Sequence, residues 1–170
     1  SSEAINTFDR NIADDASSVT AASAELKGMP QDWLAARPAG TDGLIRISMA
    51  YPDAWPVMTY ADSAELRRRV TLAFKNRAYP VNDPVVRQLI DDRARLAALV
   101  GYPSYAAYDF GNRMARTPER VEAFLADIDR VVRPIGEADA ARMLTRLRKD
   151  DPALDALDSW SGFYASRLIR

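Results

Sequence analysis

The residues best suited to chemistry in this 170-residue sequence are three neighbouring arginines, at 67–69, and two pairs of neighbouring aspartates, at 91–92 and 150–151. Neighbouring guanidiniums can gather phosphate oxygens, and paired carboxylates can act as general acid and base or hold a metal ion. Successive residues of a helix point about 100° apart, however, so none of these groups can converge on one ligand. We therefore expect the arginines to form a solvated face with ion pairs such as Glu65 with Arg69, and the aspartates to be structural.

The sequence contains no histidine and no cysteine. This composition excludes serine–histidine and cysteine–histidine nucleophile pairs, disulfides and thiolate sites, and it removes the commonest zinc ligand. A zinc site made only of carboxylates would be unusual. We therefore expect no catalytic residue and no metal ligand among these 170 residues.

The overall composition is that of a soluble globular protein, with 48% hydrophobic and 28% charged residues. A length of 170 residues suits a single domain with a substantial core. The net charge of −1 gives no general attraction to nucleic acid or to anionic membranes. We expect a cytoplasmic protein that binds neither nucleic acid nor a membrane.

The hydrophobic pattern predicts a mainly α-helical, multi-helix domain with one short strand or hairpin near residues 43–60. Alternating apolar residues indicate the strand at 44–49, and residues 57–60 are its expected partner, after an extended segment held by Pro52 and Pro56. Helices are expected at residues 3–27, 30–37, 83–101, 104–113, 117–147 and 163–169. A further helix is expected to begin at Asp62, its N-cap. Pro134 lies inside the longest of these helices, so we expect a kink or break near residue 134.

Several segments in order carry a resemblance to a known family. Residues 51–61 read Tyr-Pro-Asp-Ala-Trp-Pro-Val-Met-Thr-Tyr-Ala, and Ala-Phe-Lys-Asn-Arg-Ala follows at 73–78. Glu-Leu-Lys-Gly-Met-Pro stands at 25–30, Leu-Val-Gly-Tyr-Pro-Ser-Tyr-Ala at 99–106 and Met-Ala-Arg-Thr-Pro-Glu-Arg-Val at 114–121. Together these segments resemble the thimet oligopeptidase family of zinc metallopeptidases. The segment from Trp160 to Tyr164 resembles the family's Trp-Asp-x-x-Tyr-Tyr more weakly, with Ser161 in place of Asp and Ala165 in place of the second Tyr.

The resemblance implies a place in a larger enzyme. The family's zinc motif, His-Glu-x-x-His, lies further towards the C-terminus and is absent from this sequence. We therefore expect these residues to be a fragment of a larger zinc metallopeptidase that hydrolyses short peptides inside a deep channel. The complete family member would bind zinc, whereas this fragment is expected to bind none and to be inactive alone.

The resemblance also suggests which side chains face the channel, although a structural role is the alternative for each. The candidates are Tyr60, Arg77 and Tyr79. An aromatic cluster at Tyr102, Tyr105, Tyr108 and Phe110 is expected to pack structurally, with its hydroxyls at the surface.

Two other functions fit the same helical pattern. The first is a non-enzymatic helical module that binds peptides or proteins. The second is a dimer through the exposed C-terminal helix, whose apolar stripe reaches the last residues of the sequence.

Overall fold

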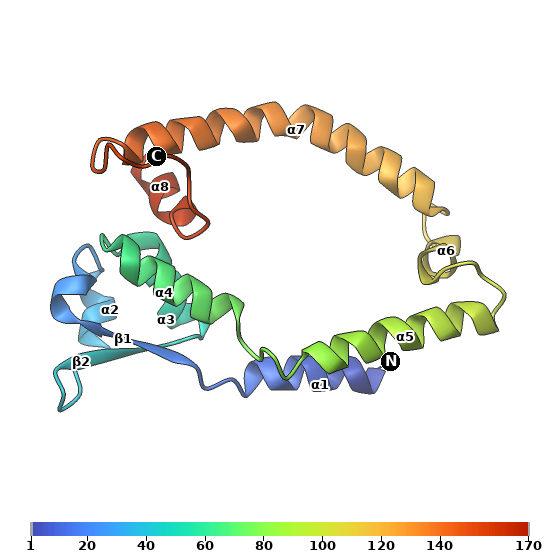
Figure 1. Cartoon of the computed structure of the whole chain (residues 1–170), viewed down its shortest axis with the longest axis horizontal. Coiled ribbons are helices and arrows are strands. Elements are labelled where there is room, and N and C mark those ends of the chain that lie inside the picture. Colours follow the sequence, from blue (N-terminus) through green and yellow to red (C-terminus); the bar gives the residue numbers. More distant parts are fainter. Residues whose placement is uncertain (1, 170) are drawn as a thin grey trace. The chain divides into compact units, whose positions relative to one another are not determined.

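The computed structural model describes residues 2–169, which form helices and one two-stranded sheet (Figure 1). The helices are α1 (Ser2–Ala13), α2 (Gln31–Ala35), α3 (Tyr51–Tyr60), α4 (Ala64–Lys75), α5 (Asp83–Leu99), α6 (Tyr105–Gly111), α7 (Pro118–Leu147) and α8 (Gly162–Leu168). The strands are β1 (Ser18–Ala22) and β2 (Leu44–Ser48), and a 3-10 turn, Ser23–Leu26, follows β1. The fold is therefore mainly α with a small sheet, as the sequence predicts. None of these described helices is long and apolar enough to cross a membrane.

The described chain divides into two compact units, and each unit is built from two separate stretches of sequence. The first unit comprises the residues up to Asp14 together with Ala78–Glu137. The second comprises Asp15–Arg77 together with the residues from Ala138 onward.

The first unit is held mainly by contacts of α5 with α1 and α6. A buried asparagine, Asn82, fixes the start of α5 to α1: its Oδ1 accepts a hydrogen bond from Asn11 Nδ2 (2.8 Å), and its Nδ2 donates to the Phe8 carbonyl (3.2 Å). Among the described residues of this unit, Ala78 and Ala97 alone are buried apolar residues. The first unit therefore has very little core of its own.

The second unit contains the principal core. Strands β1 and β2 pair antiparallel, with Val19 opposite Ile47 and Ala21 opposite Ile45. Apolar side chains from the sheet, the 3-10 turn and α2–α4 form one buried cluster, and Ile47, Leu66, Val57 and Val70 are its largest fully buried members.

The partner of β2 corrects two predictions. The predicted helix 3–27 is wrong, because α1 ends at Ala13 and residues 18–22 form β1. The Asp15 carboxylate accepts a hydrogen bond from the Ser17 amide (2.9 Å), an Asx turn that competes with helix continuation. The predicted pairing of 57–60 with the strand is also wrong, since those residues belong to α3.

Helix α3 forms where the two prolines predicted an extended segment. Pro52 lies in the first turn, where its missing amide costs no helical hydrogen bond. Pro56 lies inside the helix and leaves the Pro52 carbonyl without its helical donor. Trp33 Nε1 (3.3 Å) and Arg37 Nη2 (3.4 Å) donate to that carbonyl instead. A tertiary contact thus supplies what the local sequence lacks.

Two helix-end predictions also change. The N-cap of α4 is Ser63, whose Oγ accepts a hydrogen bond from the Leu66 amide (3.2 Å), so the predicted capping box of Asp62 with Glu65 is wrong. The sequence predicts a kink or a break near Pro134. Helix α7 continues through Pro134 without interruption, so the prediction of a break is wrong.

Candidate functional site

The three residues predicted to face a channel lie in different surroundings. Tyr60 ends α3 and is 37% exposed, with the Arg167 guanidinium 5.5 Å from its ring centre. Arg77 follows α4, donates to the carbonyls of Phe74 (3.1 Å) and Met49 (3.4 Å), and lies over the Phe74 ring. Tyr79 belongs to the first unit and is 67% exposed. Arg77 is therefore tied to its own unit, whereas the two tyrosines present accessible rings.

A buried arginine of α4 is the centre of a polar cluster in the second unit. Arg67 is 3% exposed, and its Nη1 donates to the carbonyls of Ala61 (2.8 Å) and Asp62 (3.0 Å). Its guanidinium lies 4.0 Å from the centre of the Tyr164 ring, a cation–π contact. Its buried Nε has no hydrogen-bond partner among the described residues. Burying a charge costs free energy unless hydrogen bonds or other polar contacts compensate for the lost water. The two carbonyls and the Tyr164 ring provide this compensation and hold the guanidinium in place.

Helix α8 joins this cluster through two further side chains. Tyr164 Oη donates to Asp62 Oδ1 (3.1 Å), and Arg167 Nε donates to the Thr59 carbonyl (3.1 Å). The Arg167 guanidinium also lies 5.1 Å from the Tyr164 ring centre. These contacts attach α8 to the ends of α3 and α4.

The electrostatics of the cluster follow from its burial. Burial lowers the pKa of Arg67, while the neighbouring Tyr164 and Asp62 act in the opposite direction. Burial raises the pKa of Tyr164, and its hydrogen bond to Asp62 raises it further. Tyr164 therefore remains a protonated donor at neutral pH.

A cavity of about 250 Å³ lies beside this cluster, entirely within the second unit. Arg67 and Tyr164 line it together with four carboxylates: Asp62, Asp150, Asp151 and Asp158. Asp150 also accepts a hydrogen bond from Arg146 Nη1 (2.7 Å), and Asp151 Oδ1 accepts one from the Ala153 amide (3.1 Å). Both therefore have local structural partners.

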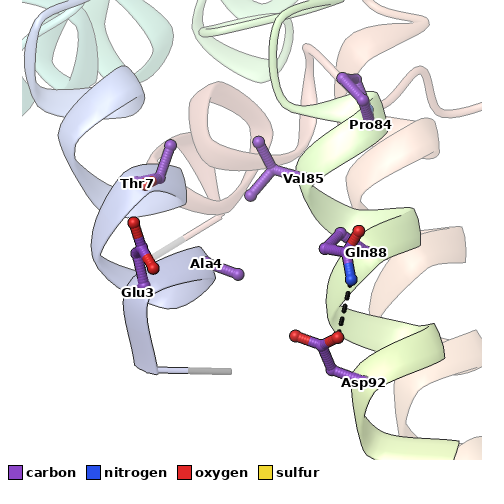
Figure 2. Close-up of a pocket in the computed structure, with 7 residues that line it drawn as sticks. All are labelled: Glu3, Ala4, Thr7, Pro84, Val85, Gln88 and Asp92. Atoms are coloured by element: carbon purple, nitrogen blue, oxygen red, sulfur yellow. Dashed lines mark hydrogen bonds between the residues drawn. The ribbon is translucent and has the colours of Figure 1, made fainter.

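A second hollow, of about 470 Å³, lies between α1 and α5 in the first unit. Figure 2 shows Glu3, Ala4 and Thr7 on the α1 side facing Val85 and Gln88 of α5. Gln88 Nε2 donates to Asp92 Oδ1 (2.7 Å) at the edge of this hollow. Its lining carries two carboxylates, an amide and a hydroxyl, a set suited to hydrogen bonding.

The residues present lack the commonest zinc ligands. The sequence supplies no imidazole and no thiolate. Among residues 2–169, no three acidic side chains are grouped so that they could hold a metal ion.

Sequence reasoning missed the role of Arg67. The prediction that the three arginines diverge is confirmed: Arg68 pairs with Glu65, whereas Arg69 pairs with Glu25. The prediction of a solvated face is wrong for Arg67, and the predicted Glu65–Arg69 pair is replaced by these two. Arg67 precedes the buried Val70 and Thr71 by three and four residues, so helical spacing places it on the buried face.

A second polar cluster, around Asp53 in the first turn of α3, was also missed. Its carboxylate accepts hydrogen bonds from Ser48 Oγ at the end of β2 and from the Arg37 guanidinium. Burial alone would raise the pKa of Asp53, but the hydrogen bonds from Ser48 and Arg37 and the Arg37 charge lower it below its usual value. The Arg37 guanidinium in turn lies over the Trp33 ring, 4.4 Å from its centre. This cluster ties α2, β2 and α3 together and is structural.

Comparison with known proteins places this chain in a family. The model of peptidase family M3 matches residues 57–169, which include the Arg67 cluster. Oligopeptidase A of Salmonella typhimurium is 32% identical over 155 residues, which cover 84% of this chain and 23% of that protein. Oligopeptidase A of Escherichia coli is 31% identical over 180 residues (97% and 26%), and saccharolysin of Saccharomyces cerevisiae is 29% identical over 150 residues (85% and 21%). The chain thus spans about a quarter of the length of these relatives. Because the family model covers more than half of the sequence, the chain belongs to peptidase family M3.

Proposed function

We propose that these residues are a helical, channel-forming part of a zinc-dependent oligopeptidase that hydrolyses short peptides, and that they are not catalytic by themselves. The observation that carries the proposal is the match of the family model over residues 57–169. Relatives named as oligopeptidases support the same substrate class. The complete enzyme would work in the cytoplasm.

The zinc ligands and the general base would come from sequence outside these residues. The chain has no histidine, and its described carboxylates are not grouped for a metal ion. The chain spans 23% and 26% of the two oligopeptidases A, which leaves most of their length for the zinc ligands and the general base. In this view, these residues shape and line the space in which the peptide lies.

The channel-lining role is assigned to Tyr60, Arg77 and Tyr79. The exposed rings of the two tyrosines can stack against peptide side chains, and their hydroxyls can hydrogen-bond a peptide backbone. Arg77 is held by two backbone carbonyls and lies over an aromatic ring, so its charge has a fixed position. A fixed charge can orient a substrate without the entropic cost of ordering a free arginine.

The competing proposal is a non-enzymatic helical module that binds peptides or proteins. The observations in its favour are that the sequence has no histidine and no cysteine, and that the described residues bring together no group of side chains for a metal ion. Such a module would bind a short peptide tightly and never turn it over, even as the product of the complete gene.

The activity test compares this 170-residue chain with the product of the complete gene on a short fluorogenic peptide. We expect no zinc-dependent cleavage by the 170 residues, because they supply no imidazole ligand. The complete product is expected to cleave the peptide, to lose activity to a chelator and to regain it with zinc. Zinc-dependent turnover by the purified 170 residues would contradict the proposal, and an inactive complete product that binds peptide would favour the module.

A further inference from the structure

The apolar stripe of α7 is uncovered within the first unit. Within the first unit it consists of large side chains that are between 43% and 63% exposed: Phe124, Leu125, Ile128, Val131, Val132 and Ile135. With about 100° between successive helical residues, all six fall within an arc of roughly 120°. Such contiguous apolar surface marks an interaction site.

The opposite side of the same helix carries charged, solvent-exposed side chains. Asp127 pairs with Arg130 (3.2 Å) and Asp129 pairs with Arg133 (2.8 Å), and all four side chains are more than half exposed. A helix with one ion-paired face and one apolar stripe buries the stripe against a neighbour. The contrast between the two faces shows which one is made for contact.

The spacing along the stripe indicates the shape of that neighbour. Val121, Leu125, Ile128, Val132 and Ile135 follow one another at intervals of four, three, four and three residues. This is the heptad spacing that packs against another helix, with side chains fitting between those of the partner. Val121 is partly buried and continues this spacing one turn before the stripe, and the row from Val121 to Ile135 covers about 21 Å of helix, enough for several turns of contact.

The comparisons indicate where such a helix would come from. The chain spans 23% and 26% of the two oligopeptidases A that it matches, so about three quarters of their length has no counterpart in it. A family whose members are that much longer supplies further chain to cover an open stripe. A second copy of the same 170 residues is the competing occupant.

We propose that the α7 stripe binds an amphipathic helix from the part of the M3 peptidase that has no counterpart in these 170 residues. The inference rests on the proposed function, because it takes the chain to be one portion of a longer peptidase. It adds the surface through which this portion is joined to the rest.

The absence of cysteine from these residues makes thiol labelling a direct test. Ile128→Cys and Val132→Cys probe the stripe at two independent positions, and Arg130→Cys on the ion-paired face of the same helix is the matched control. Each variant is made in the product of the complete gene and in the 170-residue chain. Maleimide labelling at each position is followed by peptide mass spectrometry, and circular dichroism shows that each variant is folded.

In the complete product we expect the two stripe positions to be labelled at least about tenfold more slowly than the control, because labelling then requires local opening. In the 170-residue chain all three are expected to react at similar rates. Equal rates in a complete product that still cleaves peptide would overturn the docking surface and leave the proposed function standing. Protection in the 170-residue chain that disappears on dilution would show a second copy on the stripe and would also overturn the inference. An inactive complete product, or a coding region that stops directly after residue 170 of this sequence, would instead overturn the proposed function.

Discussion

At the scale of single residues, Gly28 is the position where the backbone leaves no room for a side chain. Its φ is +90°, and an added Cβ would lie 2.5 Å from the Tyr60 carbonyl oxygen and 2.8 Å from Asp62 Oδ1. The neighbouring Lys27 carbonyl accepts a hydrogen bond from the Asp62 amide (2.8 Å), which holds the two segments together. Gly28 therefore sets how closely the turn after the 3-10 segment approaches the end of α3.

We predict that Gly28→Ala lowers the free energy of unfolding by about 2–4 kcal/mol, from left-handed strain together with overpacking. Gly43→Ala is the matched control, because Gly43 also has a positive φ (+75°) but nothing within 4 Å of an added Cβ. The control should lose about 1 kcal/mol, from strain alone. Urea denaturation followed by tryptophan fluorescence measures both. Equal losses would mean that the turn at Gly28 moves away at no cost.

Single residues also show where sequence reasoning stops. The family resemblance led to Tyr60, Arg77 and Tyr79 as channel candidates, and that assignment stays a prediction. The burial of Arg67 was not predicted, because three consecutive arginines are typical of a solvated helix face. Its burial depends on the Tyr164 ring, 97 positions later in the numbering, and no local pattern indicates such a contact.

At the scale of elements, α3 depends on a contact from another helix. The Pro52 carbonyl has no helical donor, because Pro56 has no amide hydrogen, and Trp33 of α2 donates to it. Trp33 also packs in the main core. Helix α3 and helix α2 are therefore expected to be energetically coupled.

We predict that Trp33→Phe destabilises the protein more in the natural chain than in a Pro56→Ala background. In that background the new amide can satisfy the Pro52 carbonyl from within α3, so the loss of the indole donor matters less. A double-mutant cycle by urea denaturation should give a coupling energy of about 0.5–1.5 kcal/mol, while the packing loss cancels. Additive effects of the two substitutions would show that the indole hydrogen bond contributes nothing.

The elements that the sequence predicts well are those whose signals are local. The strand at 44–48, the short helix after Pro30 and the helix after Asn82 all follow from alternation, spacing and turn residues. Strand β1 and helix α3 were not predicted from the sequence, because each depends on a partner that is distant in the sequence. Strand β1 needs β2, and α3 needs an indole from α2 to satisfy a carbonyl that proline leaves open.

At the scale of the whole molecule, the two units differ in how much apolar surface they bury. The second unit contains the main core, whereas the described part of the first buries only two alanines among its apolar residues. All three tryptophans of the sequence, Trp33, Trp55 and Trp160, belong to the second unit. Tryptophan fluorescence therefore reports on that unit alone, while far-ultraviolet circular dichroism reports on the helices of both.

We predict that the circular dichroism signal of the 170-residue chain begins to fall at lower urea concentration than the fluorescence signal. The first unit would lose its helices before the core of the second opens, because burial of apolar surface is the main source of stability. Coincident curves would contradict this and would support the single domain expected from the sequence, since coincidence of probes is the mark of a two-state transition.

The interleaving of the two units in the sequence also affects the order in which their parts can fold during synthesis. Every buried member of the main core lies between Ala21 and Val70, so this core is complete in the nascent chain before residues 78–137 have been synthesised. Helix α1 is translated before this core but must wait for α5, since Asn11 meets Asn82, 71 positions later. On the ribosome the main core can therefore assemble while α1 still lacks α5, so nascent-chain chaperones would meet α1 without this partner.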